Sequence, residues 1–92
     1  QEVSNQEYLG LIIGYDEELE SLVLKERNYF KVGDEVEIFT PTGEIYPYKI
    51  ETIYNEDNEK IEVARHPEEI LKLPFKRRLI PYSMIRLIRK TK

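Results

Sequence analysis

His66 is the only histidine in the chain, so any catalytic site that needs an imidazole base must be built around it. A Ser-His-Asp triad would take Ser83 as the nucleophile and Asp34 or Asp57 as the orienting acid. The residues around Ser83 do not resemble the sharp strand-to-helix turn that exposes a nucleophilic serine. A zinc-protease helix would need a second histidine four residues after the first, where this chain has Ile70.

The chain contains no cysteine, which excludes thiol nucleophiles, disulfides and cysteine-based zinc sites. Its paired carboxylates, such as Asp16 with Glu18, fall in polar turns, where a solvated carboxylate keeps an ordinary pKa and is a weak acid–base catalyst. Its four glycines form neither a GxGxxG nor a Walker motif. We therefore expect no catalytic residue, no metal and no cofactor in this chain.

The class of function that remains for this chain is binding. Seven Tyr and three Phe are many for 92 residues. Tyrosines that share a strand face usually pack the core with their hydroxyls at its rim. The alternative is an aromatic platform for a peptide or for unstacked bases, with Arg77, Arg78 and Arg86 beside it.

Charge is distributed unevenly along the chain. Residues 1–62 carry 16 acidic and 5 basic side chains, a net charge of −11, whereas residues 63–92 carry 2 acidic and 9 basic, a net charge of +7. The basic segment either folds back onto the acidic part, so that the fields largely cancel, or forms a face for RNA phosphates or an acidic partner domain. The residues of that face would be Lys76, Arg77, Arg78, Arg86, Arg89, Lys90 and Lys92.

Apolar residues mostly alternate with polar ones, and polar turns separate the alternating runs, which predicts short strands. Gly10 and Gly14 lie on one face of the first run, which indicates a coiled strand or a neighbour packed close to the backbone. Pro47 lacks an N–H, so its strand is an edge strand or is broken there. The expected strands cover residues 8–15, 19–25 (a hairpin with the first), 35–38, 46–54, 60–64 and 84–89, with turns at 31–34 and 41–44.

The alternation changes at His66-Pro67. Proline suits the first position of a helix and Glu68 and Glu69 suit its positive end, so a short helical turn is expected near residues 67–73, stopped by Pro74. Five to seven short strands predict an all-β fold, a small antiparallel β-barrel of the kind seen in translation factors.

Length allows a single domain, which we place at residues 7–92 after a linker or frayed terminus at 1–6. No apolar run reaches the roughly 20 residues of a membrane span, and no secretory signal is visible. We expect a cytoplasmic location and no membrane partner. Because the chain begins with Gln1, it reads as a piece of a longer protein.

Three segments in this order and spacing resemble one family. They are EYLGLIIGYDEE (7–18), RNYFKVGDEVEIFTPTGE (27–44) and the run from IEVA (61–64) through His66-Pro67 to MIR (84–86). Together they look like the C-terminal domain of the collagenase-like bacterial peptidases of unknown catalytic type, peptidase family U32. The VGDEV segment (32–36) alone is also similar to the barrel domain of translation elongation factors.

The resemblance implies an accessory barrel whose parent protein carries its Cys and His motifs in an upstream catalytic region, similar to a modified TIM barrel. Members of the family also include proteins involved in hydroxylating bases of tRNA or ribosomal RNA. The main hypothesis is therefore a non-catalytic domain that assists substrate binding of a peptidase or packs on its catalytic domain. The alternative is an RNA-binding module of an RNA-modifying relative. The expected contact residues are Tyr29, Phe30, His66, Arg77, Arg78, Arg86 and Arg89.

Overall fold

A computed structural model describes residues 7–88. Within these residues the chain forms short strands joined by turns and contains no helix, which confirms the all-β fold class. The same residues therefore include no helix able to cross a membrane. The strands are β1 (Glu7–Asp16), β2 (Ser21–Glu26), β3 (Phe30–Lys31), β4 (Glu35–Phe39), β5 (Ile45–Lys49), β6 (Ile53–Tyr54), β7 (Lys60–Ile61), β8 (Val63–Ala64), β9 (Ile70–Pro74) and β10 (Met84–Leu87).

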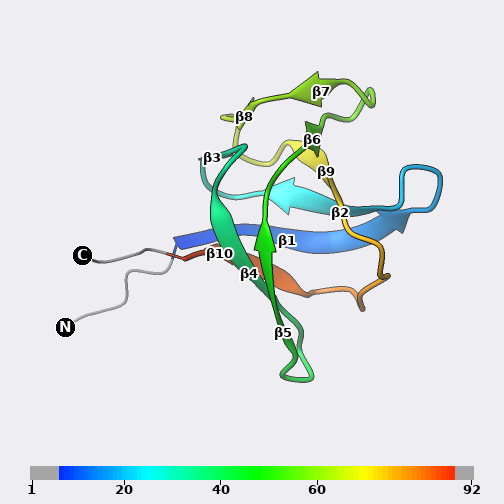
Figure 1. Ribbon diagram of the computed structural model, residues 1–92, viewed down its shortest axis with the longest axis vertical. Helices are drawn as coiled ribbons and strands as arrows, with labels where there is room; N and C mark the ends of the chain where they lie inside the picture. The colour runs from blue at the N-terminus through cyan, green and yellow to red at the C-terminus, as the bar shows by residue number, and fades with distance from the viewer. Residues whose placement is uncertain (1–6, 89–92) are drawn as a thin grey trace.

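Eight strands make one antiparallel sheet in the order β5-β4-β10-β1-β2-β9-β6-β7. The sheet curls into a half-barrel with β5 and β7 at its two edges, and the short pair β3-β8 lies at one end (Figure 1). β10, the last strand among the described residues, inserts between β1 and β4. Residues 84–87 are thereby joined to the first described strand and to β4.

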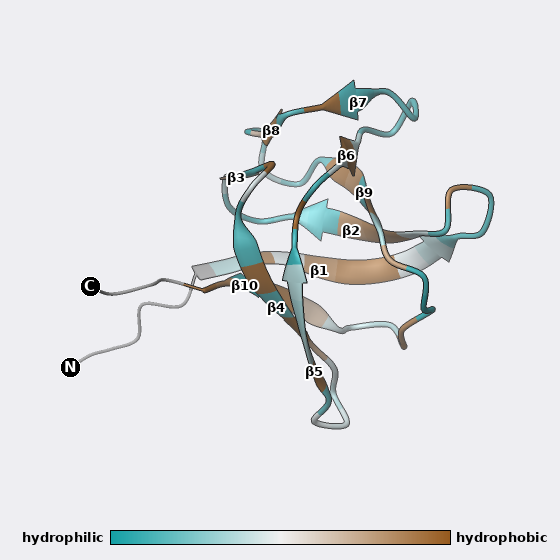
Figure 2. Cartoon of the chain, in the orientation of Figure 1, coloured by the Kyte–Doolittle hydropathy of each residue, from teal (hydrophilic) through white to brown (hydrophobic). Residues whose placement is uncertain are grey.

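The core follows from the alternation along the strands. In β2 the side chains of Leu22, Leu24 and Glu26 all point inward and are buried. Figure 2 shows apolar residues along the central strands and polar residues in most of the turns. The buried apolar residues form one cluster: Leu9, Ile12, Leu22, Leu24, Phe30, Val36, Ile38, Ile50, Ile53, Ala64, Leu71, Leu73, Leu79 and Ile85.

The β1–β2 hairpin confirms the expected first two strands and explains one of the glycines. A Cβ at Gly10 would lie 2.9 Å from the carbonyl oxygen of Lys25 and 2.5 Å from Leu24 Cδ1. The neighbouring strand therefore does pack close to the backbone at this position. At Gly14 the nearest atom, Val23 Cβ, is 4.0 Å away, so that glycine is not required by space.

Both expected turns around β4 are present. Gly33 and Gly43 have φ angles of 100° and 96°, which a residue with a Cβ adopts only with strain. β4 pairs with β5 from Glu35 to Phe39, and Pro47 lies in β5, an edge of the sheet. The proline thus occupies an edge strand, as expected from its missing N–H.

The helical turn expected near residues 67–73 is wrong. Glu68 has a φ of 71°, its N–H donates to the carbonyl of Glu26 at 2.7 Å, and the N–H of Glu26 donates to the carbonyl of Glu69 at 2.9 Å. These hydrogen bonds lead the chain into pairing with β2. In β9, Leu71 and Leu73 are then buried at a spacing of two, as a strand requires.

The single strand expected over residues 46–54 is interrupted. The carbonyl of Ile50 accepts from the N–H of Gly33 at 2.7 Å, and its own N–H donates to the carbonyl of Asp34 at 3.0 Å. β5 therefore ends at Lys49, and β6 starts at Ile53 with that residue buried. The inward-facing positions therefore shift by one residue between β5 and β6. An uninterrupted alternation of inward and outward residues over 46–54 does not predict this shift.

Candidate functional site

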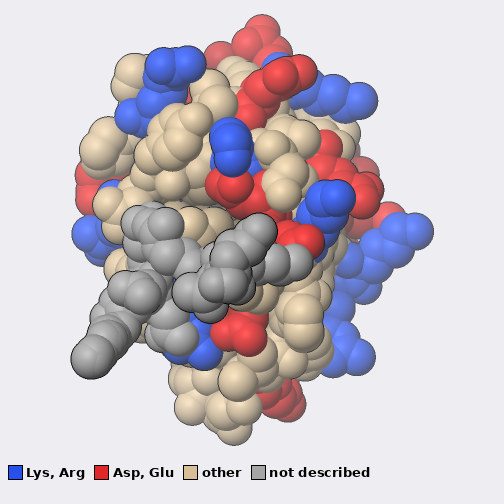
Figure 3. All heavy atoms as spheres, turned by 60° about the vertical axis from the view of Figure 1, so that its left-hand side comes forward, with Lys and Arg blue, Asp and Glu red and all other residues tan. Residues whose placement is uncertain are grey.

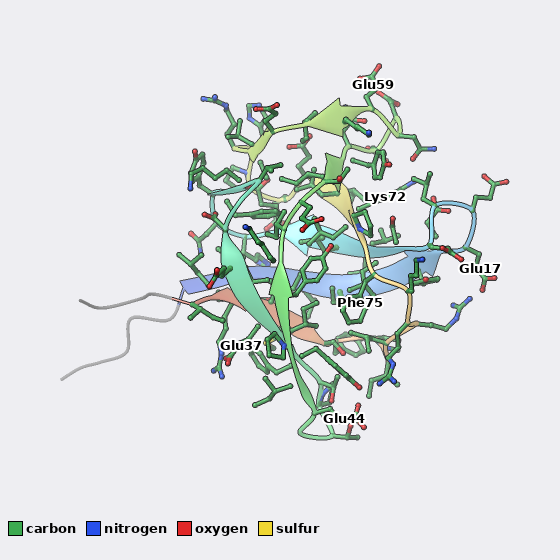
Figure 4. The ribbon with its side chains drawn as sticks, viewed as in Figure 1. Glu17, Glu37, Glu44, Glu59, Lys72 and Phe75 are labelled. Atoms are coloured by element: carbon green, nitrogen blue, oxygen red, sulfur yellow. The ribbon has the colours of Figure 1, made fainter. Side chains whose placement is uncertain are left out.

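The nine residues 75–83 join β9 to β10 and form what we call the arginine loop. Its first residue is fixed by aromatic contacts. The ring of Phe75 meets Tyr46 edge-to-face, with centroids 5.8 Å apart, and Tyr48 with centroids 5.5 Å apart. The N–H of Phe75 donates to the carbonyl of Glu20 at 3.0 Å, and its carbonyl accepts from the Tyr15 hydroxyl at 2.9 Å. Figure 4 shows Phe75 on the concave side of the sheet.

The tyrosines that share a strand face in the sequence thus pack against the core, and their hydroxyls lie at its rim. The hydroxyl of Tyr48 donates to the carbonyl of Pro74. Burial, with a smaller contribution from the charge of Glu51, raises the pKa of Tyr48 to about 12. The phenol therefore stays protonated and holds the start of the arginine loop against β5.

The far end of the loop is fixed to β1. The N–H of Ile12 donates to the carbonyl of Ser83 at 2.7 Å, and the N–H of Tyr82 donates to the carbonyl of Ile12 at 3.1 Å. The Ser83 side chain is fully buried and donates to the carbonyl of Ile80 at 2.8 Å. The hydroxyl of Ser83 is thus engaged inside the protein and helps to fix the end of the loop.

Between these anchors, two arginines are exposed and each rests on a tyrosine. The guanidinium of Arg77 lies 5.2 Å from the ring centroid of Tyr46 and donates to its hydroxyl at 2.7 Å. The guanidinium of Arg78 lies 5.1 Å from the ring centroid of Tyr15. Stacking of this kind keeps a planar cation in place while leaving its outer face open to solvent. The loop presents two oriented guanidinium groups, of which that of Arg78 is also ion-paired with Glu17.

Two hollows flank the backbone of residues 78–80. One, of about 230 Å³, is lined by Gly14, Tyr15 and residues 78–81. The other, of about 390 Å³, lies between residues 77–80 and the β4–β5 turn, where Thr40, Thr42, Glu44 and Tyr46 line it. Both hollows carry an arginine–tyrosine stack in their walls.

Acidic side chains meet the basic segment at several points. Lys72 Nζ is 2.8 Å from Asp16 Oδ2, and Arg78 pairs with Glu17 at the surface. The basic part of the sequence therefore does fold back onto the acidic part. On the face seen in Figure 3, Lys and Arg are interspersed with Asp and Glu.

The other expected contact arginines are not part of this loop. Arg86 on β10 is bonded to Glu37 through Nε at 3.0 Å and stands 4.7 Å from the ring centroid of Phe39. Its charge is thus neutralised on the surface of β4. Arg89 lies outside the described residues.

Tyr29, Phe30 and His66 lie at the end of the domain where β3 pairs with β8. Phe30 is 1% exposed, which makes it a core residue with no surface to offer. Tyr29 and His66 are exposed, and the pairing of Phe30 with Ala64 sets them on adjoining segments. The structure therefore separates the described contact residues into three places: Arg77 and Arg78 in the arginine loop, Arg86 on β10, and the other three at the β3–β8 end.

Beside His66, the structure buries an acid that the sequence did not single out. Glu26 is 1% exposed, and no donor among the described residues reaches its carboxyl oxygens at hydrogen-bonding geometry. Burial, with a smaller contribution from Glu69, raises the pKa of Glu26 to about 7, although the His66 amide opposes the shift. The one sequence signal for the burial of Glu26 is the alternation along β2, which places it on the same face as Leu22 and Leu24.

Within residues 7–88, no three His, Asp or Glu side chains are grouped so as to hold a metal ion. The arrangement suits recognition of a planar or anionic group at the arginine loop. Sequence reasoning found its arginines by charge alone and missed Tyr15 and Glu44. Those two come from strands and turns distant in the chain, so only the folded topology brings them together.

Comparison with known proteins agrees with this architecture. The crystal structure of the C-terminal domain of a U32-family protein from Geobacillus thermoleovorans superimposes with a TM-score of 0.80 at 43% identity, covering 90% of this chain and 93% of that one. Its selenomethionine variant gives a TM-score of 0.79 at 45% identity, covering 87% and 98%.

Among curated proteins, tRNA hydroxylation protein P1 of Bacillus subtilis (strain 168) is 41% identical over 80 residues. The match covers 87% of this chain and 19% of the length of that relative. The family model described as the peptidase family U32 C-terminal domain matches residues 4–86 and confirms the resemblance seen in the sequence motifs. The chain therefore belongs to the C-terminal domain family of peptidase family U32.

Proposed function

We propose that this domain is an RNA-contacting module of a U32-family protein that takes part in tRNA hydroxylation. The observation that carries the proposal is the arginine loop, in which Arg77 and Arg78 stack on tyrosines beside two hollows. The relative from Bacillus subtilis, named for tRNA hydroxylation, supports the same direction.

The chemistry of the loop fits an RNA strand. Guanidinium groups bind phosphate oxygens, and their exposed planes accept unstacked bases. The chain as a whole carries a net charge of −4, so attraction to RNA is local to the loop instead of spread over the surface. Such a module adds affinity to an RNA held elsewhere on the same protein.

The proposal leaves the chemical step to the rest of the parent protein. Ser83 is buried and hydrogen-bonded, and His66 is exposed on another part of the surface. We infer that the isolated domain has no catalytic activity and needs no cofactor. A role on tRNA also supports a cytoplasmic location.

A second candidate function is capture of a protein segment, either a peptide substrate or the upstream catalytic domain. Ile80 and Tyr82 favour it, because these large side chains are 47% and 69% exposed on the arginine loop. The family name points to peptides as well. This reading predicts binding to unfolded collagen that is insensitive to salt, since apolar contacts are not screened.

The deciding experiment measures the affinity of the 92-residue chain for tRNA by fluorescence anisotropy at several salt concentrations. Replacing Arg77 and Arg78 together by Glu should raise the Kd about tenfold and flatten its salt dependence. The matched control replaces Lys60 and Arg65 by Glu, two exposed cations outside the loop. Equal losses in the two double variants, or no binding of tRNA at low salt, would remove the proposal.

A further inference from the structure

The hollow between the arginine loop and the β4–β5 turn has opposite charges on its two walls. Arg77 and Arg78 line one wall, and Glu44 stands on the other, at the tip of the hairpin seen in Figure 4. Its volume of about 390 Å³ is within the range of small-molecule sites. A nucleotide is complementary to these two walls. Its anionic phosphate suits the arginine wall, and hydrogen-bond donors on its base suit the carboxylate wall.

The wall that carries Glu44 is built in a fixed conformation. The N–H of Thr40 donates to the carbonyl of Glu44 at 2.9 Å, and the N–H of Glu44 donates to Thr40 Oγ1 at 3.1 Å. The hydroxyls of Thr40 and Thr42 are hydrogen-bonded to each other at 3.1 Å. Thr40 is only 5% exposed, so the backbone under Glu44 cannot swing freely.

The carboxylate itself has capacity for a ligand. Glu44 Oε1 accepts from the hydroxyl of Tyr46 at 3.1 Å, and a carboxylate offers about four acceptor positions over its two oxygens. Tyr46 also carries the stacked guanidinium of Arg77. Tyr46 thereby contacts both Arg77 and Glu44. A base can stack on the planar guanidinium of Arg77, and the carboxylate of Glu44 can accept a hydrogen bond from the edge of that base.

An acceptor at this place distinguishes bases. Adenine, cytosine and guanine each carry an exocyclic amino group that donates to a carboxylate, whereas uracil has a carbonyl oxygen in place of the cytosine amino group and offers only its N3–H as a donor. We propose that this hollow binds a single unstacked nucleobase bearing an amino group, with Glu44 selecting for it; this proposal rests on the RNA-binding function proposed above. The phosphate of the same nucleotide is held at Arg77 and Arg78.

The test compares the affinities of the 92-residue chain for the labelled RNA hexamers C6 and U6 at low salt. Wild-type protein should prefer C6 about tenfold, the lower end of the contribution of one charge-assisted hydrogen bond. Glu44→Gln should bring the two affinities together. Glu59→Gln is the matched control, because Glu59 also accepts one side-chain hydrogen bond, from Asn55 at 3.1 Å, and lies at the opposite end of the domain (Figure 4).

The outcomes test the base site separately from the RNA-binding function on which it rests. If tRNA binds but the preference for C6 is absent or survives in Glu44→Gln, the base site is wrong and RNA binding stands. If tRNA does not bind at all, the function itself is wrong. A third arm titrates free CMP: equal affinity for CMP and C6 would assign the hollow to free nucleotides and overturn the RNA assignment.

Discussion

The N–H of Glu26 donates to the carbonyl of Glu69 at 2.9 Å, so a fully buried carboxyl and a second acid lie on paired backbone segments at the end of β2. Burial, with a smaller contribution from the nearby charge of Glu69, raises the pKa of Glu26 to about 7 from an ordinary value of 4.5. Folding therefore favours the protonated form of this residue.

The first prediction concerns stability against pH. Because the folded pKa is above the unfolded one, the stability linked to Glu26 is fully present below pH 4.5 and is lost as pH rises through 7. The free energy of unfolding should fall by no more than about 3 kcal/mol over that window. Glu26→Gln should remove this fall, as measured by urea denaturation at pH 5 and pH 8.

Glu59→Gln serves as the control, since it alters an exposed acid in the β6–β7 turn and should leave the pH dependence unchanged. A wild-type protein equally stable at both pH values would show that Glu26 ionises without cost.

The second prediction concerns the close approach of β2 to β1. Gly10→Ala should destabilise the domain by about 1–3 kcal/mol, because the new methyl group would meet the backbone oxygen of Lys25, which cannot move alone. Gly14→Ala should be neutral or slightly stabilising, since its Cβ has room and the unfolded chain loses freedom. Thermal denaturation of both variants checks the pair, and equal effects would contradict the packing described for Gly10.

The third prediction concerns the anchor of the arginine loop. Phe75→Ala removes edge-to-face contacts with Tyr46 and Tyr48 and should cost about 2 kcal/mol of stability. Phe75→Leu should cost less, because it still fills the space. Hydrogen exchange should also accelerate for residues 76–80 in the alanine variant; unchanged exchange there would mean that the other hydrogen bonds alone hold the loop.

The fourth prediction separates charge from stacking. Arg77→Lys keeps the positive charge but loses the planar guanidinium that rests on Tyr46. We expect RNA affinity to fall about threefold with the slope of the salt dependence unchanged, whereas Arg77→Ala should lower both. Anisotropy titrations at two salt concentrations distinguish the variants. A lysine variant as tight as wild type would show that Arg77 acts only as a charge.

The strands were largely predictable because their alternation is local. Leu22 and Leu24 alternate in the sequence and are buried alternately in the structure. The segment after His66 was mispredicted because its helix-start residues are overridden by nonlocal hydrogen bonds to Glu26. Tertiary pairing decides between strand and turn where the local signal is short.

The candidate site was predictable only in part. Arg77 and Arg78 stand out in the sequence by charge, but their tyrosine partners come from β1 and β5. The turn that carries Glu44 was expected, yet its position opposite the arginine loop depends on β10 inserting beside β4. Strand order of this kind is a property of the whole fold and has no local signature.

Pro47 lies in the middle of the outermost strand β5 and has no N–H to offer. An extended segment of another molecule cannot complete a continuous hydrogen-bonded ladder along that edge. Capture of peptides by strand addition, and edge-to-edge aggregation of two copies, are both disfavoured there. Recognition along this edge of the domain is thereby left mainly to side chains.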